Sequence, residues 1–541
     1  MIELKLKLIF LPWYHLGPNR EDIYGERGFP PLGIATLTAF LRKHGIDVEQ
    51  DDLEIKVIAH NEKSDNPEES IDLHYFCDEE RIDKLIEGGE ETLEREGEKI
   101  LKLTKCGGFD AIGLSLHSTD NVSVIGVALT ISKLLKEKYG TTIITGDIMD
   151  RLALKKLLSS RFVDCSLASS HIASLAEVNL LKFCEMFEKV GDLQQIPGSI
   201  HLQNDGLKYT RAYETYTKEE KSIFTVPEFD GLPMDLYKYT VSSEIYGNTY
   251  TSKILIIPYI FIYGCPNSCA FCTYSKFPLT SLKPPEEVAD DLEFLSKKYN
   301  SRYFFFMNTE INPTKDYALS VADALIDKDL DIFWTDCAAF KNMDVELIEK
   351  LRQAGAARLV WGMENASPRL LEYINKDIML DHAKACLEKS SMLGVWNQVL
   401  FICGFPYERE IDIDFTIDFI EKNRKFIHET TLNKFFIDGL FDARPEEFNI
   451  RVGDQTKSYR NWTTKPFDEV NGLPWGERSK LTLKFYDRLW DALNKLRIHG
   501  TMPTQIVFHL ARLERDLGVK IENKDVFNFS KAGLSYKYFV N

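Results

Sequence analysis

Residues 262–273 read IYGCPNSCAFCT, and this stretch decides the fold. Its cysteines, Cys265, Cys269 and Cys272, are spaced as CxxxCxxC directly after an apolar run at 254–262. Gly and Pro within the stretch predict a strand that ends in a tight loop. Thiolates are the ligands that hold iron–sulfur clusters. Three of them on one short loop predict three ligated irons of a [4Fe–4S] cube, with the fourth iron left open as in catalytic metal sites.

A structural zinc site is the alternative for these cysteines. Such sites usually pair two CxxC units and need a fourth ligand nearby, and no other Cys or His lies within twenty residues of the motif. The spacing therefore favours the cluster. Most of the other cysteines are scattered, and we expect them to be small buried apolar residues rather than disulfides: Cys77, Cys106, Cys165, Cys184 and Cys386.

Composition limits the classes of function. The chain has 541 residues, enough for about three or four domains. Its net charge of −17 argues against a large phosphate-binding face, so we expect no nucleic-acid partner. No apolar run approaches the ~20 residues of a membrane span, and the N-terminus lacks the pattern of a signal peptide. The sequence thus predicts a cytoplasmic protein without a membrane partner.

The first part of the chain, 1–195, alternates strands and helices. Expected strands lie at 4–11, 111–116, 141–145 and 162–167. This alternation predicts an α/β domain with a doubly wound, Rossmann-like parallel sheet. Residues 196–250 carry turn signals and read as a linker.

Residues 251–440 repeat the alternation at a shorter period. Six strands are expected, at 254–262, 303–307, 331–337, 358–361, 398–403 and 434–437. With helices between them, they predict a partial (β/α)6 barrel. Residues 441–541 read as a mostly helical C-terminal region.

The cysteine motif and the β/α units behind it resemble the radical S-adenosylmethionine (SAM) superfamily over about 255–440. The aromatic Phe271 before the last cysteine belongs to the pattern of that family. The resemblance implies a [4Fe–4S] cluster and SAM as cofactors. In the family, the open iron binds the amino and carboxylate groups of SAM, and reduction yields a 5′-deoxyadenosyl radical that removes hydrogen from a substrate.

The resemblance also implies SAM-binding positions. Asn308 and Glu310 end the second strand, where the family places polar groups for the SAM amino group. Glu364 belongs to a segment similar to Gly-x-Glu-Ser, here with Asn365 for Ser. Another segment is similar to the Gly-Phe-Pro-Gly-Glu turn that meets the adenine, with Tyr for the second Gly, and it supplies Gly404, Phe405 and Pro406. Helix caps and surface carboxylates are the alternative for each position.

The layout of the chain resembles two groups within the family, cobalamin-dependent methyltransferases and enzymes that mature ribosomal peptides, including proteusin-type epimerases. Two loops of the first domain depart from the corrin-binding pattern, with Asp147 and the Ser169-Ser170-His171 segment where glycines are usual. Glycines there would let the backbone approach a bulky ligand. The expectation from sequence is a Rossmann-like domain that has lost cobalamin.

Without a methyl carrier, a peptide epimerase is the preferred interpretation, acting on residues of a ribosomally made precursor with a leader. A thiol would return the hydrogen, and Cys337 and Cys403 stand at strand ends facing the expected site. An external reductant such as flavodoxin or ferredoxin is the second expected partner. The alternatives are a cobalamin-dependent C-methyltransferase and a non-catalytic, cluster-bearing peptide-binding protein.

Overall fold

The structure is a computed structural model. It describes residues 4–14, 28–64, 66–116, 122–146, 151–167, 176–187, 193–204, 206–210, 224–245, 248–272, 281–438, 448–453, 464–498, 500, 502–519 and 535–538. The chain divides into two compact units, and the main boundary falls between Tyr237 and Lys238.

The first unit is built on a seven-stranded sheet of order β2-β1-β3-β4-β5-β6-β7. Strands β1 to β5 are parallel, whereas β6 and β7 are antiparallel additions at one edge. The strands are β1 (Lys5–Phe10), β2 (Asp47–Asp52), β3 (Ala111–Ser115), β4 (Thr142–Gly146), β5 (Cys165–Leu167), β6 (Ser199–Gln203) and β7 (Gly206–Tyr209). The predicted doubly wound α/β sheet is confirmed.

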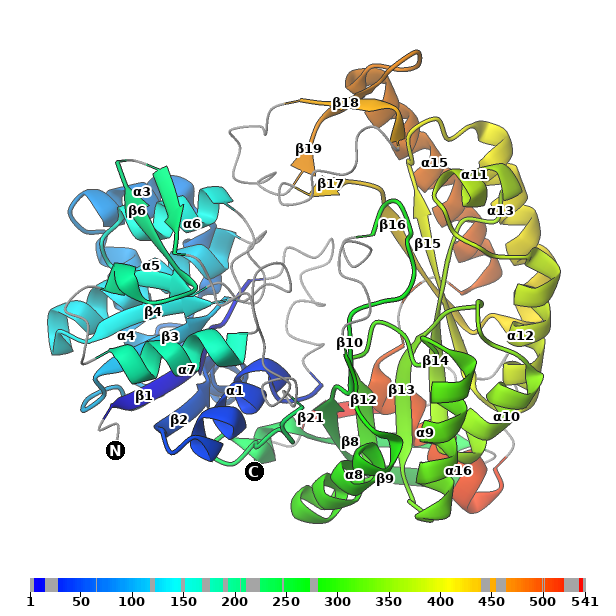
Figure 1. The fold of residues 1–541 in the computed structure, drawn as a ribbon, viewed down its shortest axis with the longest axis horizontal. Coiled ribbons are helices and arrows are strands. Elements are labelled where there is room, and N and C mark those ends of the chain that lie inside the picture. Colours follow the sequence, from blue (N-terminus) through cyan, green and yellow to red (C-terminus); the bar gives the residue numbers. More distant parts are fainter. Residues whose placement is uncertain are drawn as a thin grey trace. The chain divides into compact units, whose positions relative to one another are not determined.

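Helices connect these strands, and Figure 1 shows them on both sides of the sheet. They are α1 (Leu32–Lys43), α2 (Leu53–Lys63), α3 (Glu79–Glu87), α4 (Glu91–Leu101), α5 (Val122–Tyr139), α6 (Arg151–Ser159) and α7 (Ala176–Met186). Helix α5 is apolar over most of its surface, and Val124, Ile125 and Leu129 are fully buried in the core with Ile112 of β3. Such a helix is stable only when neighbours cover it.

Strand β2 was not predicted, because its sequence DVEQDD is poor in the β-branched and aromatic residues that favour strands. Two of its acidic side chains, Asp51 and Asp52, are buried and paired, whereas Asp47 and Glu49 are exposed. Asp51 accepts a hydrogen bond from Lys56 at 2.8 Å, and Asp52 accepts one from Ile55 N, so that it caps α2. Tertiary partners thus stabilise a strand that local propensity disfavours.

The second unit is built on an eight-stranded sheet of order β16-β15-β14-β13-β12-β9-β8-β21. Its strands are β8 (Lys238–Ile245), β9 (Asn248–Tyr259), β12 (Tyr303–Phe306), β13 (Phe333–Ala338), β14 (Ala356–Glu364), β15 (Trp396–Cys403), β16 (Glu429–Lys434) and β21 (Ser535–Tyr538). The strands from β9 through β16 are parallel, and β8 and β21 join antiparallel.

The six parallel strands form the expected partial barrel (Figure 1). Helices follow the strands on the outside: α8 (Pro285–Tyr299), α9 (Lys315–Asp327), α10 (Val345–Gln353), α11 (Pro368–Tyr373), α12 (Leu380–Met392) and α13 (Glu410–Asn423). The sixth strand lies at Glu429–Lys434, earlier than the expected 434–437, because its pairing with β15 runs from Gln398↔Glu429 to Cys403↔Lys434.

The region 196–250, expected to be a linker, differs in the structure. It contains β6, β7 and β8 and the beginning of β9. The described part of 441–541 combines β18 (Ile450–Val452), β20 (Phe467–Glu469), α15 (Trp475–Leu496), α16 (Thr504–Leu517) and β21. Pairing between strands as distant as β8 and β21 leaves no local signal in the sequence.

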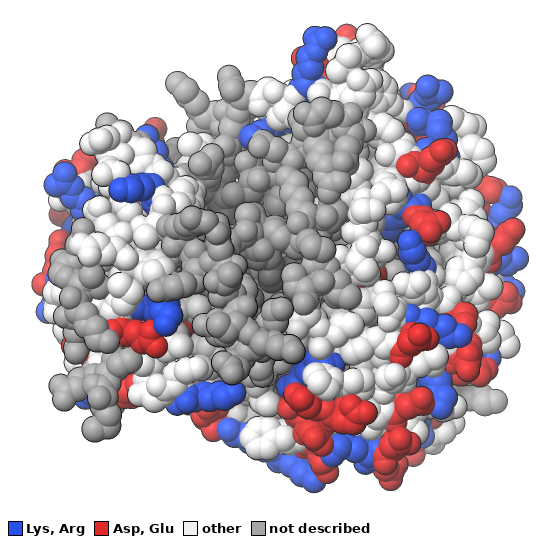
Figure 2. Space-filling view, viewed as in Figure 1, with Lys and Arg blue, Asp and Glu red and all other residues white. Residues whose placement is uncertain are grey.

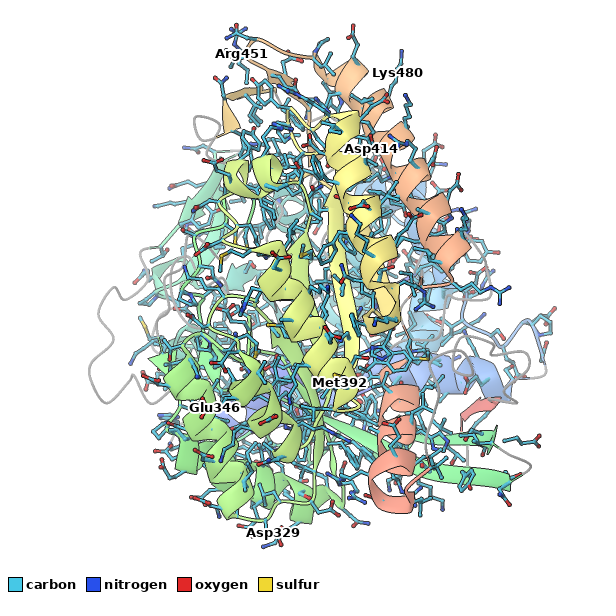
Figure 3. The ribbon with its side chains drawn as sticks, turned by 90° about the vertical axis from the view of Figure 1, so that its right-hand side faces the viewer. Asp329, Glu346, Met392, Asp414, Arg451 and Lys480 are labelled. Carbon is cyan, nitrogen blue, oxygen red and sulfur yellow. The ribbon has the colours of Figure 1, made fainter. Side chains whose placement is uncertain are left out.

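The outer helices of the second unit carry charged residues of both signs. Figure 2 shows acidic and basic side chains interspersed, and on α8 and α9 Lys328 pairs with Asp290 at 2.6 Å and with Glu293 at 3.0 Å. Figure 3 looks onto the helices, with Glu346 of α10 and Asp414 of α13 on their exposed side. Among the described residues, none of the helices has the length and apolar character needed to cross a membrane.

Candidate active site

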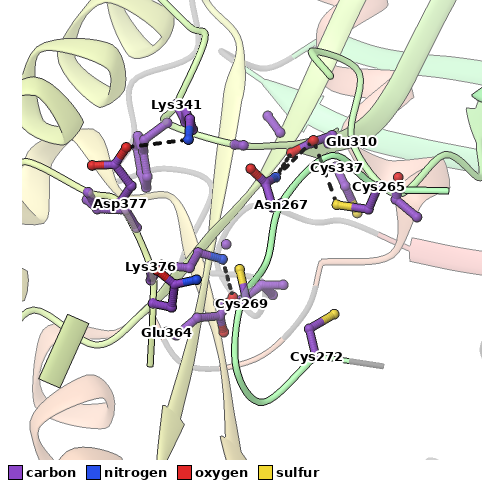
Figure 4. A pocket seen from close by; sticks show the side chains of 18 of the residues that line it. Cys265, Asn267, Cys269, Cys272, Glu310, Cys337, Lys341, Glu364, Lys376 and Asp377 are labelled. Atoms are coloured by element: carbon purple, nitrogen blue, oxygen red, sulfur yellow. Dashed lines mark hydrogen bonds and ion pairs between the residues drawn. The ribbon is translucent and has the colours of Figure 1, made fainter. Parts of the chain in front are cut away.

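A cavity of about 750 Å³ opens at the carboxyl ends of the barrel strands. The cysteine loop, 265–272, forms one wall, and the ends of β12, β13 and β14 together with residues from 368–378 form the others (Figure 4). The structure thereby brings together most of the site residues proposed from sequence at the edge where parallel sheets bind their ligands. Those that line the cavity are Cys265, Cys269, Cys272, Asn308, Glu310, Cys337 and Glu364.

The cysteine loop is held by contacts at both ends. Gly264 turns the chain with φ of +88°, a conformation that favours glycine. Its carbonyl accepts a hydrogen bond from Thr309 Oγ1 at 2.7 Å. At the other end, Asn375 Nδ2 donates to Ser268 O and Oγ, each at 2.8 Å, and Ala270 N donates to Ile374 O at 2.9 Å. The loop is therefore positioned by the chain around it.

The fit to a cluster can be tested on the thiols themselves. Within the described ranges, no three His, Cys, Asp or Glu side chains are grouped so as to hold one metal ion. A four-iron cube makes a different demand, because each thiolate binds its own iron. Burial raises the pKa of the Cys265 thiol to about 11, and negative charge on Glu310, Cys272 and Cys269 adds to the rise. The thiols thus share one electrostatic environment, which a cationic cluster core would relieve. Because Cys265, Cys269 and Cys272 also line one cavity, the donor set fits the cluster.

Asn308 joins the second and third strand ends to the start of the cysteine loop. Its Oδ1 accepts hydrogen bonds from Phe261 N and Ile262 N at 3.0 Å, and its Nδ2 donates to Asp336 Oδ2 at 2.7 Å. Asp336 is buried, and that burial raises its pKa well above the usual range. Asn308 lines the cavity, yet its amide is engaged within the protein.

Glu310 faces the cysteine loop. Asn267 Nδ2 donates to its two carboxylate oxygens at 2.9 and 2.8 Å, and Cys265 Sγ lies 3.8 Å from Oε1. Burial raises the pKa of Glu310 to about 7. This carboxylate therefore stands beside the first cysteine with hydrogen-bonding capacity left for a ligand.

Glu364 ends β14 in an unusual conformation. A register irregularity between Gly362 and Glu364 is followed by a φ of +64° at Glu364, so both residues face the cavity. Lys376 Nζ donates to Glu364 Oε1 at 2.9 Å. Burial lowers the pKa of Lys376, but the charges of Glu364 and Cys269 outweigh it and raise that pKa overall.

The turn at 403–408 lies outside the lining of this cavity. Gly404 has a φ of +88°, and its N–H donates to Glu408. Phe405 is buried and meets the Phe271 ring edge-on, with 5.5 Å between ring centres. The turn thus contacts the cysteine loop through Phe405, while the roles expected for Gly404, Phe405 and Pro406 stay predictions.

The two candidate thiol donors occupy different surroundings. Cys337 is half-buried and lines the cavity, and burial raises its pKa to about 12. Cys403 is fully buried and does not line it. Sequence reasoning missed Lys376, Asn375 and Asn267. The polar run at 375–377 carries no motif, and only the fold brings it to the cysteine loop.

In the first unit, the order β2-β1-β3-β4 places a topological switch point between β1 and β3. Most of the residues in the loops after β1, β3, β4 and β5 lie outside the described ranges, and so do Asp147 and Ser169-Ser170-His171. At the carboxyl end of β4, Thr145 Oγ1 is buried with no hydrogen-bond partner among the described residues. A buried polar atom of this kind usually has a partner.

Comparison with known proteins supports the resemblance of the second unit to the radical SAM superfamily. Residues 259–420 match the model of the radical SAM superfamily. An uncharacterised methyltransferase from Pyrococcus horikoshii is 24% identical over 64% of this chain and 70% of its own. The anaerobic magnesium-protoporphyrin IX monomethyl ester cyclase of Rubrivivax gelatinosus is 26% identical over 27% of each chain. The cytidylyl-2-hydroxyethylphosphonate methyltransferase of Streptomyces wedmorensis is 27% identical over 31% of this chain and 30% of its own.

Two solved structures share the fold over nearly the whole chain. The radical SAM methyltransferase TsrM from Kitasatospora setae, solved with cobalamin and a [4Fe–4S] cluster, gives a TM-score of 0.60 at 13% identity and covers 98% of this chain and 96% of TsrM. The cobalamin-dependent radical enzyme OxsB, solved with aqua-cobalamin and SAM, gives a TM-score of 0.54 at 15% identity, covering 98% of this chain and 66% of OxsB.

These comparisons correct the expected activity. The interpretation as a peptide epimerase with a cysteine hydrogen donor is wrong, because the similar proteins include several methyltransferases and the matched folds come from cobalamin-dependent enzymes. That interpretation depended on the absence of glycine at positions in two loops of the first domain. Glycine at such positions determines only how closely the backbone can approach a ligand. These positions do not determine whether the rest of the sheet edge can bind a ligand.

The cysteine loop, the partial barrel and the family match agree on one assignment. Residues 259–420 of this chain form a radical SAM domain, which implies a [4Fe–4S] cluster and SAM as its cofactors.

Proposed function

We propose that the protein is a cobalamin-dependent radical SAM methyltransferase. The observation that carries the proposal is the pairing, in one chain, of a doubly wound sheet with a radical SAM barrel, matched to TsrM over 98% of this chain. The similarity to the uncharacterised methyltransferase from Pyrococcus horikoshii over 64% of the chain also supports it.

The first unit is the proposed site of cobalamin. Sheets of its strand order bind ligands at the switch point beside the first strand, outside the carboxyl ends. Thr145 Oγ1 stands at that edge as a buried polar atom with no described partner, which fits a bound ligand there. Cobalamin, when bound, supplies a carrier for the methyl group of SAM.

In the second unit, Cys265, Cys269 and Cys272 are the proposed ligands of the [4Fe–4S] cluster, which when bound supplies the electron for SAM cleavage. Glu310 and Glu364 present carboxylates to the cavity beside the cysteine loop, where they can accept hydrogen bonds from the SAM amino group and ribose. Asn308 holds the loop in place through its backbone contacts. An external reductant such as flavodoxin or ferredoxin is the proposed electron source.

The test is cofactor retention. Protein purified and reconstituted anaerobically is mixed with hydroxocobalamin and passed through a gel-filtration column. We expect iron and corrinoid to elute with the protein, each in a fixed stoichiometric ratio. Elution of the protein with its cluster but free of corrinoid would contradict the methyltransferase proposal and leave the radical SAM assignment intact.

A further inference from the structure

The segment Ile374–Lys376 clasps the cysteine loop. Ile374 O accepts from Ala270 N, and Asn375 reaches Ser268 with its side chain. Lys376, the next residue, directs its ammonium toward the same loop, 5.9 Å from the centre of the Phe271 ring (Figure 4). Because the two preceding residues are bonded to the loop, the position of Lys376 relative to the cysteines is set by the clasp.

Lys376 and Glu364 form an ion pair at the cavity wall. The two side chains are 17% and 9% exposed, and Nζ and Oε1 are 2.9 Å apart. Glycine at 362 makes room for them, because a Cβ there would lie 2.9 Å from both Lys376 Nζ and Glu364 Oε1. Glu364, which accepts from the ammonium, has a positive φ. Gly362 and the positive φ of Glu364 thus both occur where the chain accommodates this ion pair.

The position of this pair has an electrostatic consequence. The Lys376 charge acts directly on Cys269 and Cys272, and Glu364 acts on Cys269 with the opposite sign. A partly buried charge is screened less than an exposed one. A cation beside cluster thiolates favours the oxidation state with more negative charge, which is the reduced state. Second-shell charges of this kind adjust the properties of a metal site.

We propose that Lys376 is a positioning residue that raises the reduction potential of the cluster, and that Glu364 limits this effect by pairing with it. The proposal rests on the cluster of the proposed function, but not on cobalamin or methyl transfer. It assigns a role to a residue that contacts the cysteine loop without being a ligand.

The experiment is a redox titration of the reconstituted full-length protein without SAM, followed by electron paramagnetic resonance. Iron content is measured first for every variant. Lys376→Met removes the charge and keeps an unbranched side chain of nearly the same length, whereas Lys376→Arg keeps the charge. Glu364→Gln removes the opposing charge. The matched control is Lys341→Met, since Lys341 lines the same cavity but is half-exposed and pairs with Asp377 at 3.5 Å.

We expect Lys376→Met and Glu364→Gln to shift the midpoint potential of the cluster in opposite directions. Lys376→Met should shift the midpoint to a more negative value, with a severalfold fall in the ratio of reduced to oxidised cluster at a fixed potential. A tenfold fall would correspond to about 59 mV for a one-electron couple. Glu364→Gln should shift the midpoint in the positive direction, Lys376→Arg should stay near wild type, and Lys341→Met should shift it less than Lys376→Met does.

If Lys376 and Glu364 only held the cysteine loop in place, their variants would change the iron content without shifting the midpoint potential in opposite directions. Shifts of the same sign in Lys376→Met and Glu364→Gln would therefore overturn the proposal. An unchanged midpoint in Lys376→Met together with weaker SAM binding would also overturn it and make Lys376 a SAM-binding residue. If Lys376→Met holds no iron, the sign of the Glu364→Gln shift decides. A wild-type protein without a cluster would contradict the proposed function as well.

Discussion

Asn308 Nδ2 lies 2.7 Å from Asp336 Oδ2, so that the ends of β12 and β13 are joined beneath the cysteine loop. The same Asn308 side chain accepts from Phe261 N and Ile262 N, the two residues that lead into that loop. One buried amide thus couples the barrel strands to the proposed cluster ligands.

Asn308→Ala removes this connection. It leaves two buried N–H groups and Asp336 Oδ2 without this partner, while Cys337 N still donates to Asp336 Oδ1. Each unsatisfied group costs about 1–3 kcal/mol. We expect a lower free energy of unfolding in urea and less iron per chain after reconstitution. Asn433→Ala, at an exposed position on β16, is the control. Equal iron content and stability in the two variants would show that Asn308 does not hold the loop.

The three cysteines of the motif should each be needed. Single substitutions of Cys265, Cys269 or Cys272 by Ala should lower the iron content and abolish SAM cleavage, because a cube with two protein ligands is poorly held. Cys386→Ala is the control, since Cys386 is buried in α12 away from the cavity. Iron analysis and chromatography of the SAM products check the result. A variant that cleaves SAM at the wild-type rate would remove that cysteine from the ligand set.

Sequence could predict the parts that depend on local pattern. The CxxxCxxC spacing identified the cysteine loop, and apolar runs located five of the six parallel barrel strands. The strand β2 could not be predicted, because its stability comes from partners such as Lys56 rather than from the β propensity of its own residues. Lys376 escaped because it meets the cysteine loop only in the folded chain, where the neighbouring Asn375 contacts Ser268 across 107 residues.

The expectation that the first domain has lost cobalamin rests on a local loop pattern alone. Asp147 and His171 are local departures from that pattern, whereas the solved structures of TsrM and OxsB, which share the fold, contain cobalamin. The strand order of the first unit, which no local motif encodes, is the more informative property, because it sets the switch point where ligands bind.

His509 should make the stability of the second unit depend on pH. Its ring nitrogens lie 2.8 Å from Ser243 Oγ and 2.7 Å from Ser252 Oγ, which join α16 to β8 and β9. Burial and the charge of Arg512 lower the pKa of His509 from 6.5 to about 4. Because the unfolded chain binds the proton more tightly, the stabilisation is complete above pH ~6.5 and is lost as the pH falls toward ~4.

The free energy of unfolding should fall by ~3 kcal/mol over this pH range. Urea unfolding at several pH values measures it, with His509→Gln as the matched variant that cannot titrate in this range. The difference in stability between wild type and His509→Gln should diminish as the pH falls from ~6.5 to ~4. A constant difference would mean that His509 is protonated to the same extent in the folded and unfolded chains.

The central claim is methyl transfer from SAM through a bound corrinoid, and isotope labelling tests it most directly. Protein loaded with cluster and hydroxocobalamin is reduced and incubated with SAM that carries a trideuterated methyl group, and the protein-bound corrinoid is extracted for mass spectrometry. The account predicts that the label is found on the corrinoid. A Cys265→Ala variant, with its lowered iron content, is the comparison. Label that stays entirely in SAM and its cleavage products, in wild-type protein that retains both cofactors, would contradict the account.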